Sequence, residues 1–112
     1  MADAYLKKEA LSRVEFDWCE ANISHIARHN VLPHEAEEVV TNDPIDLSVT
    51  MRNGEERTEQ IGETASGRIL RIVTTPRNGK IRVITAVPLR TRWHERYFTL
   101  KEKRDAGDQN LS

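Results

Sequence analysis

The fold is decided by residues 45–87, which read IDLSVTMRNGEERTEQIGETASGRILRIVTTPRNGKIRVITAV. Apolar and polar residues alternate from Ile45 to Met51, which is the pattern of a half-buried strand. Residues 52–55 contain Asn-Gly, the pair that favours a tight hairpin turn. Three further β-rich runs follow, at 56–61, 68–75 and 81–87, separated by a looser turn at 62–67 and a hairpin turn at 76–79. The segment therefore predicts an antiparallel meander of four strands in chain order.

Helices are predicted before and after this meander. Residues 20–30 have an apolar face, and Asn30 suits a helix C-terminus because asparagine accepts a left-handed backbone. Pro33 suits the first turn of a second helix, which is predicted over residues 34–41. A final helix is predicted from Pro88 to about Arg104. Its apolar residues recur at helical spacing and predict a face for docking: Leu89, Trp93, Tyr97 and Leu100.

The complete prediction is an α+β fold with a short first strand, two helices, the four-stranded antiparallel meander and the C-terminal helix. The first strand is expected at residues 14–18, where apolar residues alternate. Residues 1–12 are expected to be a frayed helical lead-in. The domain is expected to span residues 13–104, and residues 105–112 are expected to be a disordered tail.

Length and composition limit the class of protein. A chain of 112 residues suits one domain with one modest core. The single cysteine, Cys19, excludes an internal disulfide, so nothing in the chain indicates an oxidising compartment. The first ten residues lack the apolar region of a signal peptide, and no apolar run reaches the length of a membrane span. We therefore expect a cytoplasmic protein without membrane contact.

The near-neutral charge conceals two opposed halves. Residues 1–66 contain 6 Lys and Arg against 14 Asp and Glu, whereas residues 67–104 contain 11 against 2. Such asymmetry points to an anionic partner for the basic half. The alternative is that the acidic helices pack beside the basic sheet and neutralise it internally. The sequence alone leaves both possibilities open.

The basic charge is concentrated in residues 80–104, where a strand carrying Arg82 leads through Pro88 into the final helix. Strand ends and helix starts hold cations rigidly, and fixed guanidinium groups can stabilise an RNA phosphate without a metal. Arg92 and Arg96 are four residues apart and could clamp one phosphate. The competing interpretation is a solvated basic helix.

Three blocks of sequence resemble the BrnT toxins of bacterial type II toxin–antitoxin systems. The first is FDWCEANISHIARHNVLPHEAEEV at 16–39, with an aromatic-Asp-Trp strand, a helix ending near His and Val, and an acidic second helix. The second is RNGEERTEQIGETASGRILRIV at 52–73, with its Glu-Arg and Gly-Arg-aliphatic runs. The third combines KIRVITA at 80–86 with RWHERY at 92–97. The similarity covers about residues 13–98.

This resemblance implies a fold similar to RelE-type endoribonucleases and RNA cleavage without a metal or other cofactor, in which the 2′-hydroxyl attacks the adjacent phosphate. It also implies neutralisation by a cognate DNA-binding antitoxin of the BrnA type, with DNA contacted only through that antitoxin. Together with the basic segment, it gives candidate catalytic residues at His29, Arg82, Arg92, Arg96 and Tyr97. Candidate RNA-binding residues are Arg57, Arg68, Arg71, Lys80 and Arg90.

The chain departs from the family pattern at two places near this candidate site. Many members end the last strand with Ser-Ala-Arg, whereas this chain has Thr85-Ala86-Val87. Trp93 replaces a glutamate that is common four residues before the helix tyrosine. The absence of the strand-end arginine removes one candidate phosphate ligand, so the expected outcomes are weaker catalysis, a site that uses Arg90 or Arg92 instead, or no catalysis. The alternative function is therefore a catalytically silent homologue that binds an antitoxin or nucleic acid.

Several candidates also have simpler structural explanations. His25 and His29 are four residues apart, but zinc needs further ligands that the sequence does not supply nearby. Tyr97 falls on the apolar stripe of the final helix and could pack in the core. Arg57 follows two glutamates and could pair with a carboxylate across the sheet. Cys19 has no neighbouring base that would make it a nucleophile.

Overall fold

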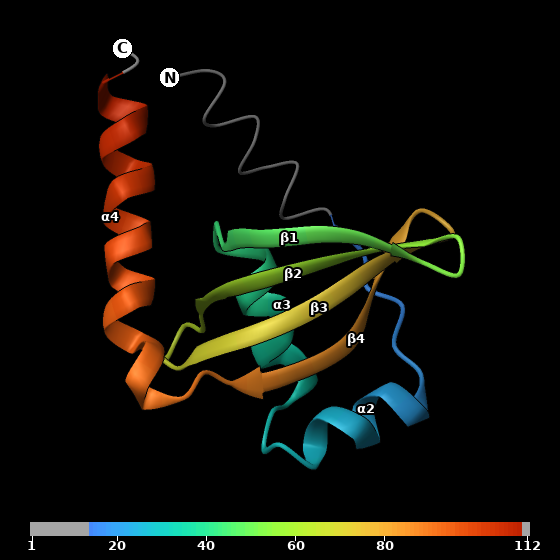
Figure 1. Cartoon of the computed structure of the whole chain (residues 1–112). Helices are drawn as coiled ribbons and strands as arrows, with labels where there is room; N and C mark the ends of the chain where they lie inside the picture. Colours follow the sequence, from blue (N-terminus) through green and yellow to red (C-terminus); the bar gives the residue numbers. More distant parts are fainter. Residues whose placement is uncertain (1–13, 111–112) are drawn as a thin grey trace.

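The computed structural model describes residues 14–110, and the lead-in expected at residues 1–12 lies outside this range. Two short helices come first, α2 (Glu20–Ala27) and α3 (Pro33–Thr41). Four strands follow, β1 (Ile45–Arg52), β2 (Glu55–Glu63), β3 (Ile69–Arg77) and β4 (Lys80–Pro88). The described part ends with a 3₁₀ turn, η1 (Thr91–Trp93), and a long helix, α4 (His94–Asn110) (Figure 1).

The predicted four-stranded meander is confirmed. The strands pair antiparallel in the order β1-β2-β3-β4. Asn53 and Gly54 have φ of 53° and 76°, and Asn78 and Gly79 have φ of 53° and 77°. Both hairpins therefore use two-residue turns with positive φ at both positions, whose twist matches that of the flanking strands. The second turn is shorter than the predicted 76–79, and Pro76 and Arg77 continue β3.

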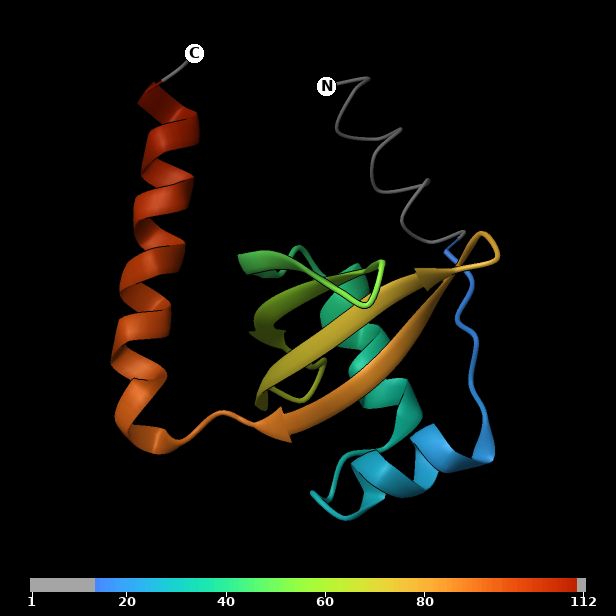
Figure 2. The same cartoon turned by 45° about the vertical axis from the view of Figure 1, so that its right-hand side comes forward.

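One face of the sheet packs against α2 and α3 and carries the main core (Figure 2). Strand residues Leu70, Ile72, Val83 and Ala86 meet Val31 of the link between the helices and four helix residues: Ile26, Ala36, Val39 and Val40. Helix α3 approaches β2 closely at Gly62, where a Cβ atom would lie 2.9 Å from Val39 Cγ1 and 3.2 Å from Pro44 Cβ. Gly62 therefore faces the helices. Because side chains alternate along a strand, this assigns each residue of β2 either to the helix side or to the opposite side of the sheet.

Helix α2 ends at Ala27 and is followed by the predicted left-handed residue, Asn30, with φ of 59°. The N–H of Val31 donates to the carbonyl of Ile26 at 3.2 Å, and that of Asn30 donates to Ala27 at 3.0 Å. These two bonds form a Schellman motif, and the buried pair Ile26 and Val31 supplies its apolar contact. The motif directs the chain from α2 towards α3.

Glu35 joins α3 to the sheet. Its carboxylate accepts from the backbone N–H of Leu32 at 3.0 Å and from Arg68 Nη1 at 2.8 Å. Arg68 also donates to the carbonyl of Asn30 at 3.0 Å. Desolvation by burial tends to raise the pKa of Glu35, but the bonds from Arg68 and Leu32 outweigh it, so its pKa is lowered.

The expected first strand is reduced to one parallel bridge between Phe16 and Ile81 of β4. The N–H of Asp17 donates to the carbonyl of Ile81 at 2.8 Å, and the N–H of Ile81 donates to Glu15 at 2.9 Å. Phe16 and Trp18 pack against the main core, as the alternation predicted. Pairing stops there because the chain turns into α2 at Glu20.

The final helix differs from its prediction at both ends. It starts at His94 instead of Pro88, because β4 continues through Pro88 and the N–H of Leu89 still donates to Ile69 at 2.8 Å. It continues to Asn110, beyond the predicted end near Arg104. Figures 1 and 2 show α4 standing beside the sheet instead of lying across it. The apolar stripe is therefore only partly used, with Tyr97 buried and Trp93 exposed.

Three side chains of α4 hold it against the end of the sheet. Tyr97 is buried with Ile61 and Ile69 in a second, smaller core cluster. Lys101 Nζ lies 3.2 Å from Glu63 Oε1, and Arg104 Nη1 donates to the carbonyls of Asp43 and Pro44 at 3.1 and 3.2 Å. Among the described residues, no helix is long and apolar enough to span a membrane.

Candidate functional site

The candidate site lies on the face of the sheet opposite α2 and α3, which we call the open face. Gly62 faces α3, so alternation along β2 places Ile61, Glu59 and Arg57 on the open face. Arg71 on β3 pairs in register with Ile61 and with Val87 of β4, so it shares this face. The strands thus present polar and charged side chains on a rigid surface.

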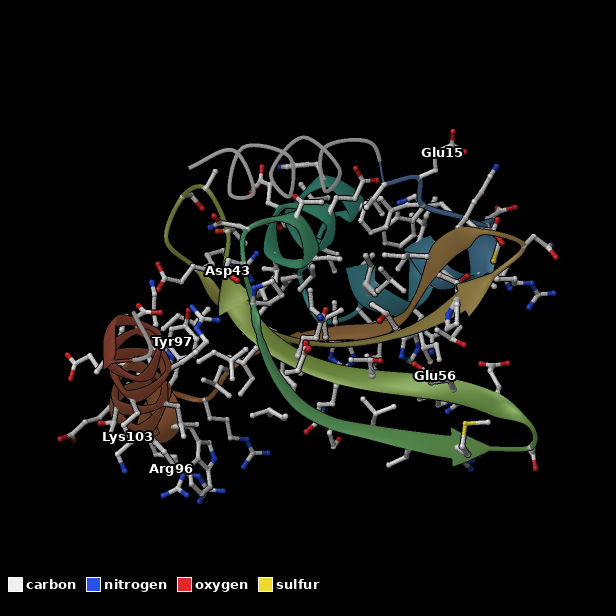
Figure 3. The ribbon with its side chains drawn as sticks, turned by 90° about the horizontal axis from the view of Figure 1, so that it is seen from above. Glu15, Asp43, Glu56, Arg96, Tyr97 and Lys103 are labelled. Carbon is white, nitrogen blue, oxygen red and sulfur yellow. The ribbon has the colours of Figure 1, made fainter. Side chains whose placement is uncertain are left out.

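At one end of the open face, α4 and the sheet enclose a groove of about 500 Å³, which we call the α4 groove. Its apolar lining comes from Leu47, Ile61, Val87, Pro88, Leu89, Trp93, Tyr97 and Leu100. Its cationic lining comes from Arg71, Arg90, Arg92 and Arg96. Figure 3 looks along α4 and shows Arg96 and Tyr97 projecting from different sides of this helix. Four guanidinium groups thus surround a pocket with an apolar wall.

Much of the charge asymmetry between the two halves of the chain is neutralised internally. Basic residues after position 66 pair with acidic residues before it: Arg68 with Glu35, Arg71 with Glu59, Arg77 and Arg82 with Asp17, Lys80 with Glu15, Lys101 with Glu63 and Arg104 with Asp43. In the described range, no carboxylate pairs with Arg90, Arg92 or Arg96. Of the four basic residues in the described range after position 66 that lack such a partner, Arg90, Arg92 and Arg96 line the α4 groove, and Lys103 does not.

The groove arginines differ in how they are held. Arg71 is fixed by its ion pair with Glu59. The guanidinium carbon of Arg92 lies 5.2 Å from the centroid of the Trp93 ring, within the range of a cation–π contact. Arg90 and Arg96 are exposed. Arg71 can therefore orient an anion, while the others add charge at the groove mouth.

Tyr97 contributes its ring to the α4 groove, while its hydroxyl donates to Glu63 Oε1 at 3.1 Å. Desolvation by burial, followed by the Glu63 carboxylate, raises the pKa of Tyr97 to about 12. The hydroxyl is therefore protonated at neutral pH and is committed to a residue that does not line the groove. Its geometry is that of a packing and anchoring residue.

The structure brings together only part of the predicted site. Arg71, Arg90, Arg92, Arg96 and Tyr97 line the same groove. Arg57 and Arg82 share the open face nearer the hairpin ends of the strands. The other three predicted residues lie elsewhere: Arg68 bonds to Glu35 and Asn30, Lys80 lies 3.7 Å from Glu15 beside the second hairpin, and His29 follows α2 in the helical layer.

Two residues near the site are not among the predicted site residues. His94 Nε2 lies 2.9 Å from the carbonyl of Leu89 and fixes the turn between β4 and α4. Glu59 is the carboxylate held against Arg71. Sequence spacing does not predict either contact. The His94 contact depends on where α4 begins, and the Glu59 contact depends on the register of β2 against β3.

His25 of α2 contacts both His29, which follows the helix, and the edge of the sheet. The centroids of the two histidine rings are 5.7 Å apart in an edge-to-face arrangement, and His25 Nε2 lies 3.2 Å from Thr85 Oγ1. Within the described residues, no group of three or more His, Cys, Asp or Glu side chains is arranged to hold a metal ion.

Comparison with protein-family models gives a match. The family model described as "Ribonuclease toxin, BrnT, of type II toxin-antitoxin system" matches residues 18–92. This range includes α2, α3, the whole sheet and the first two residues of η1, and it ends at a residue that lines the α4 groove. The comparison with curated proteins found no match. Because the family model covers most of the chain, the protein belongs to the BrnT family of type II toxin–antitoxin ribonuclease toxins.

Proposed function

We propose that this protein is a metal-independent endoribonuclease that inhibits translation by cutting RNA, with the α4 groove as its substrate site. The observation that carries the proposal is the gathering of four guanidinium groups around one groove, three of them without an internal carboxylate partner. An RNA phosphate supplies the missing negative charge. The apolar wall and the exposed ring of Trp93 suit an unstacked base, as single-stranded RNA presents.

The proposed chemistry is attack of a 2′-hydroxyl oxygen on the adjacent phosphorus, which forms the O2′–P bond, breaks the P–O5′ bond and leaves a 2′,3′-cyclic phosphate. The leaving 5′-oxygen takes a proton from water and becomes a 5′-hydroxyl. Negative charge develops on the phosphate oxygens in the transition state. Arg71 would stabilise this charge from a fixed position, and Arg92 and Arg96 would add positive charge at the groove mouth. Glu59, held by Arg71 beside the groove, is the proposed acceptor of the 2′-hydroxyl proton. Tyr97 would position α4, and no step is assigned to His29 because it lies in the helical layer.

The alternative is a catalytically silent member of the family that keeps only its binding surface. Val87 favours it, because this residue lines the α4 groove directly across from Arg71, where the resemblance places an arginine in many relatives. A valine cannot donate to a phosphate. The two functions therefore differ at a position where a single substitution can distinguish them.

Val87→Arg is expected to raise RNA cleavage by about tenfold or more, because it adds a guanidinium opposite Arg71. Val87 is only half-buried and faces the groove, so the new side chain can reach solvent. Cleavage of a labelled RNA by wild-type and variant protein measures the effect. Val49→Arg, the same change at an exposed position of β1, is the control. A folded Val87→Arg protein that binds its antitoxin but leaves RNA intact would favour the silent module.

The proposed partner is a cognate antitoxin, an acidic segment of which covers the arginines of the α4 groove. We expect the association rate to fall by about tenfold or more between 50 and 500 mM salt, because added ions screen long-range attraction. Stopped-flow measurements at several salt concentrations test this. An association rate that does not change with salt would indicate that the antitoxin docks on an apolar surface instead.

A further inference from the structure

Three polar side chains form a row across the open face, away from the α4 groove. Thr75 of β3 pairs in register with Arg82 of β4. Thr58 pairs with Thr74, so Arg57 of β2 flanks Thr75 from the other side. Since neighbouring strands lie about 4.8 Å apart, the row spans roughly 10 Å. We call these three residues the Arg-Thr-Arg row.

Each member of the row has a buried polar atom that lacks a hydrogen-bond partner among the described residues. These atoms are Arg57 Nε, Thr75 Oγ1 and Arg82 Nε. Thr75 is only 3% exposed. Buried polar groups are normally paired, because an unpaired one has lost its hydrogen bonds to water without replacing them. Three such atoms thus lie close together on adjacent strands without a partner from the described residues.

Neighbouring carboxylates do not satisfy these atoms. Asp17 Oδ2 accepts from Arg82 at 2.8 Å, but through Nη2 and not through Nε. Glu55 Oε1 lies 3.7 Å from Arg57 Nε, which is too far for a hydrogen bond. Both arginine side chains remain partly exposed, at 30% and 21%, whereas the three unpaired atoms are buried, so an anion would reach these atoms only after the arginine side chains move. All three unpaired atoms can donate a hydrogen bond, so a ligand that binds them together must supply hydrogen-bond acceptors.

We propose that the Arg-Thr-Arg row binds a phosphate of the RNA backbone, at a subsite distinct from the α4 groove. This inference rests on the proposed ribonuclease function. A phosphate offers several acceptor oxygens and a negative charge, which suits two guanidinium groups and a hydroxyl. Arg71 and Thr75 lie on the same face of β3, four residues or about 13 Å apart. A single RNA strand crossing the sheet would contact the groove and the row together.

Thr75→Val removes the hydroxyl while keeping a β-branched side chain, so we expect RNA binding to weaken by about tenfold. The probe is a fluorescent single-stranded RNA with 2′-O-methyl groups, which cannot be cleaved, and the readout is anisotropy. Thr74→Val is the matched control, because it makes the same change one residue earlier, on the face that packs against the helices. Arg57→Lys, which keeps the charge but loses Nε, is a second variant and should also weaken binding.

The possible results separate this inference from the proposed function. If Thr75→Val and Arg57→Lys bind RNA as wild type does, while Arg92→Ala with Arg96→Ala binds weakly, the subsite is wrong and the ribonuclease remains. If the wild-type protein binds no RNA, both the subsite and the proposed ribonuclease function are wrong. Inorganic phosphate that raises the melting temperature of wild type but not of Thr75→Val, without any RNA effect, would assign the row to free phosphate. Loss of antitoxin binding alone would assign it to a protein carboxylate.

Discussion

Replacing Arg92 and Arg96 together with alanine is expected to lower the rate of RNA cleavage by about 10²-fold or more. Both guanidinium groups line the α4 groove, and neither has a carboxylate partner in the described part of the chain. Loss of one preorganised donor to a developing oxyanion typically costs about 10²–10³-fold in rate. Cleavage of a labelled RNA at saturating protein concentration separates this effect from weaker binding.

The matched control is Arg28→Ala with Arg52→Ala, which removes the same charge from two exposed arginines outside the groove. It should change cleavage by only a few-fold, through the weaker long-range field. Folding of both double variants should match wild type, because Arg92 and Arg96 make no ion pair that holds the fold. Equal losses in the two double variants would show that net charge, and not the groove, supports activity.

Leu70→Ala is expected to cost about 2–5 kcal/mol in the free energy of unfolding. Leu70 is fully buried, at 0% exposure, in the core between β3 and the helices. A domain of this size has a total stability of only about 5–15 kcal/mol, so this change removes a large share. Urea unfolding followed by circular dichroism measures it.

Leu32→Ala is the control for this change, since Leu32 is 54% exposed at the start of α3. An exposed leucine loses little on truncation, so the expected change is within about 0.5 kcal/mol. A Leu70→Ala protein as stable as the Leu32→Ala protein would mean that the core does not lie between β3 and the two helices.

The sheet could be predicted from the sequence because its turns carry local signals. The two Asn-Gly pairs require positive φ, and their two-residue turns set the register of both hairpins. Asn30 could be predicted to end the first helical segment because asparagine, like glycine, accepts a positive φ. Phe16 and Trp18 could be assigned to the core from their alternation alone. In each of these cases, one or two residues determine the backbone locally.

The final helix could not be placed from its pattern. Pro88 is compatible with a helix start, but the bond from Leu89 to Ile69 extends the sheet pairing instead. The stripe of apolar residues predicted docking along the whole segment, whereas only Tyr97 is buried and Trp93 is exposed at the groove. The position of α4 depends on contacts with Glu63 and Asp43, far away in the sequence.

The candidate site was predicted in part for similar reasons. Arg92 and Arg96 were expected to act together, and the structure places both at one groove. Arg68 was predicted to bind RNA, but in the structure it pairs with Glu35 of α3, which is distant in the sequence. Thr75 could not be predicted as a site residue, because a threonine in a strand is not by itself typical of a binding site. Its place opposite Arg82 follows from the Asn78-Gly79 turn, but its unpaired hydroxyl depends on the packing around it.

The central claim is that fixed arginines in this protein cleave RNA without a metal. The most direct measurement is incubation of purified protein with a labelled single-stranded RNA in excess EDTA, followed by analysis of the new 3′ ends. We expect cleavage to continue and to leave 2′,3′-cyclic phosphate or 3′-phosphate ends, because the 2′-hydroxyl is the attacking group. Cleavage that requires an added divalent metal, or that leaves 3′-hydroxyl ends, would contradict the proposed mechanism.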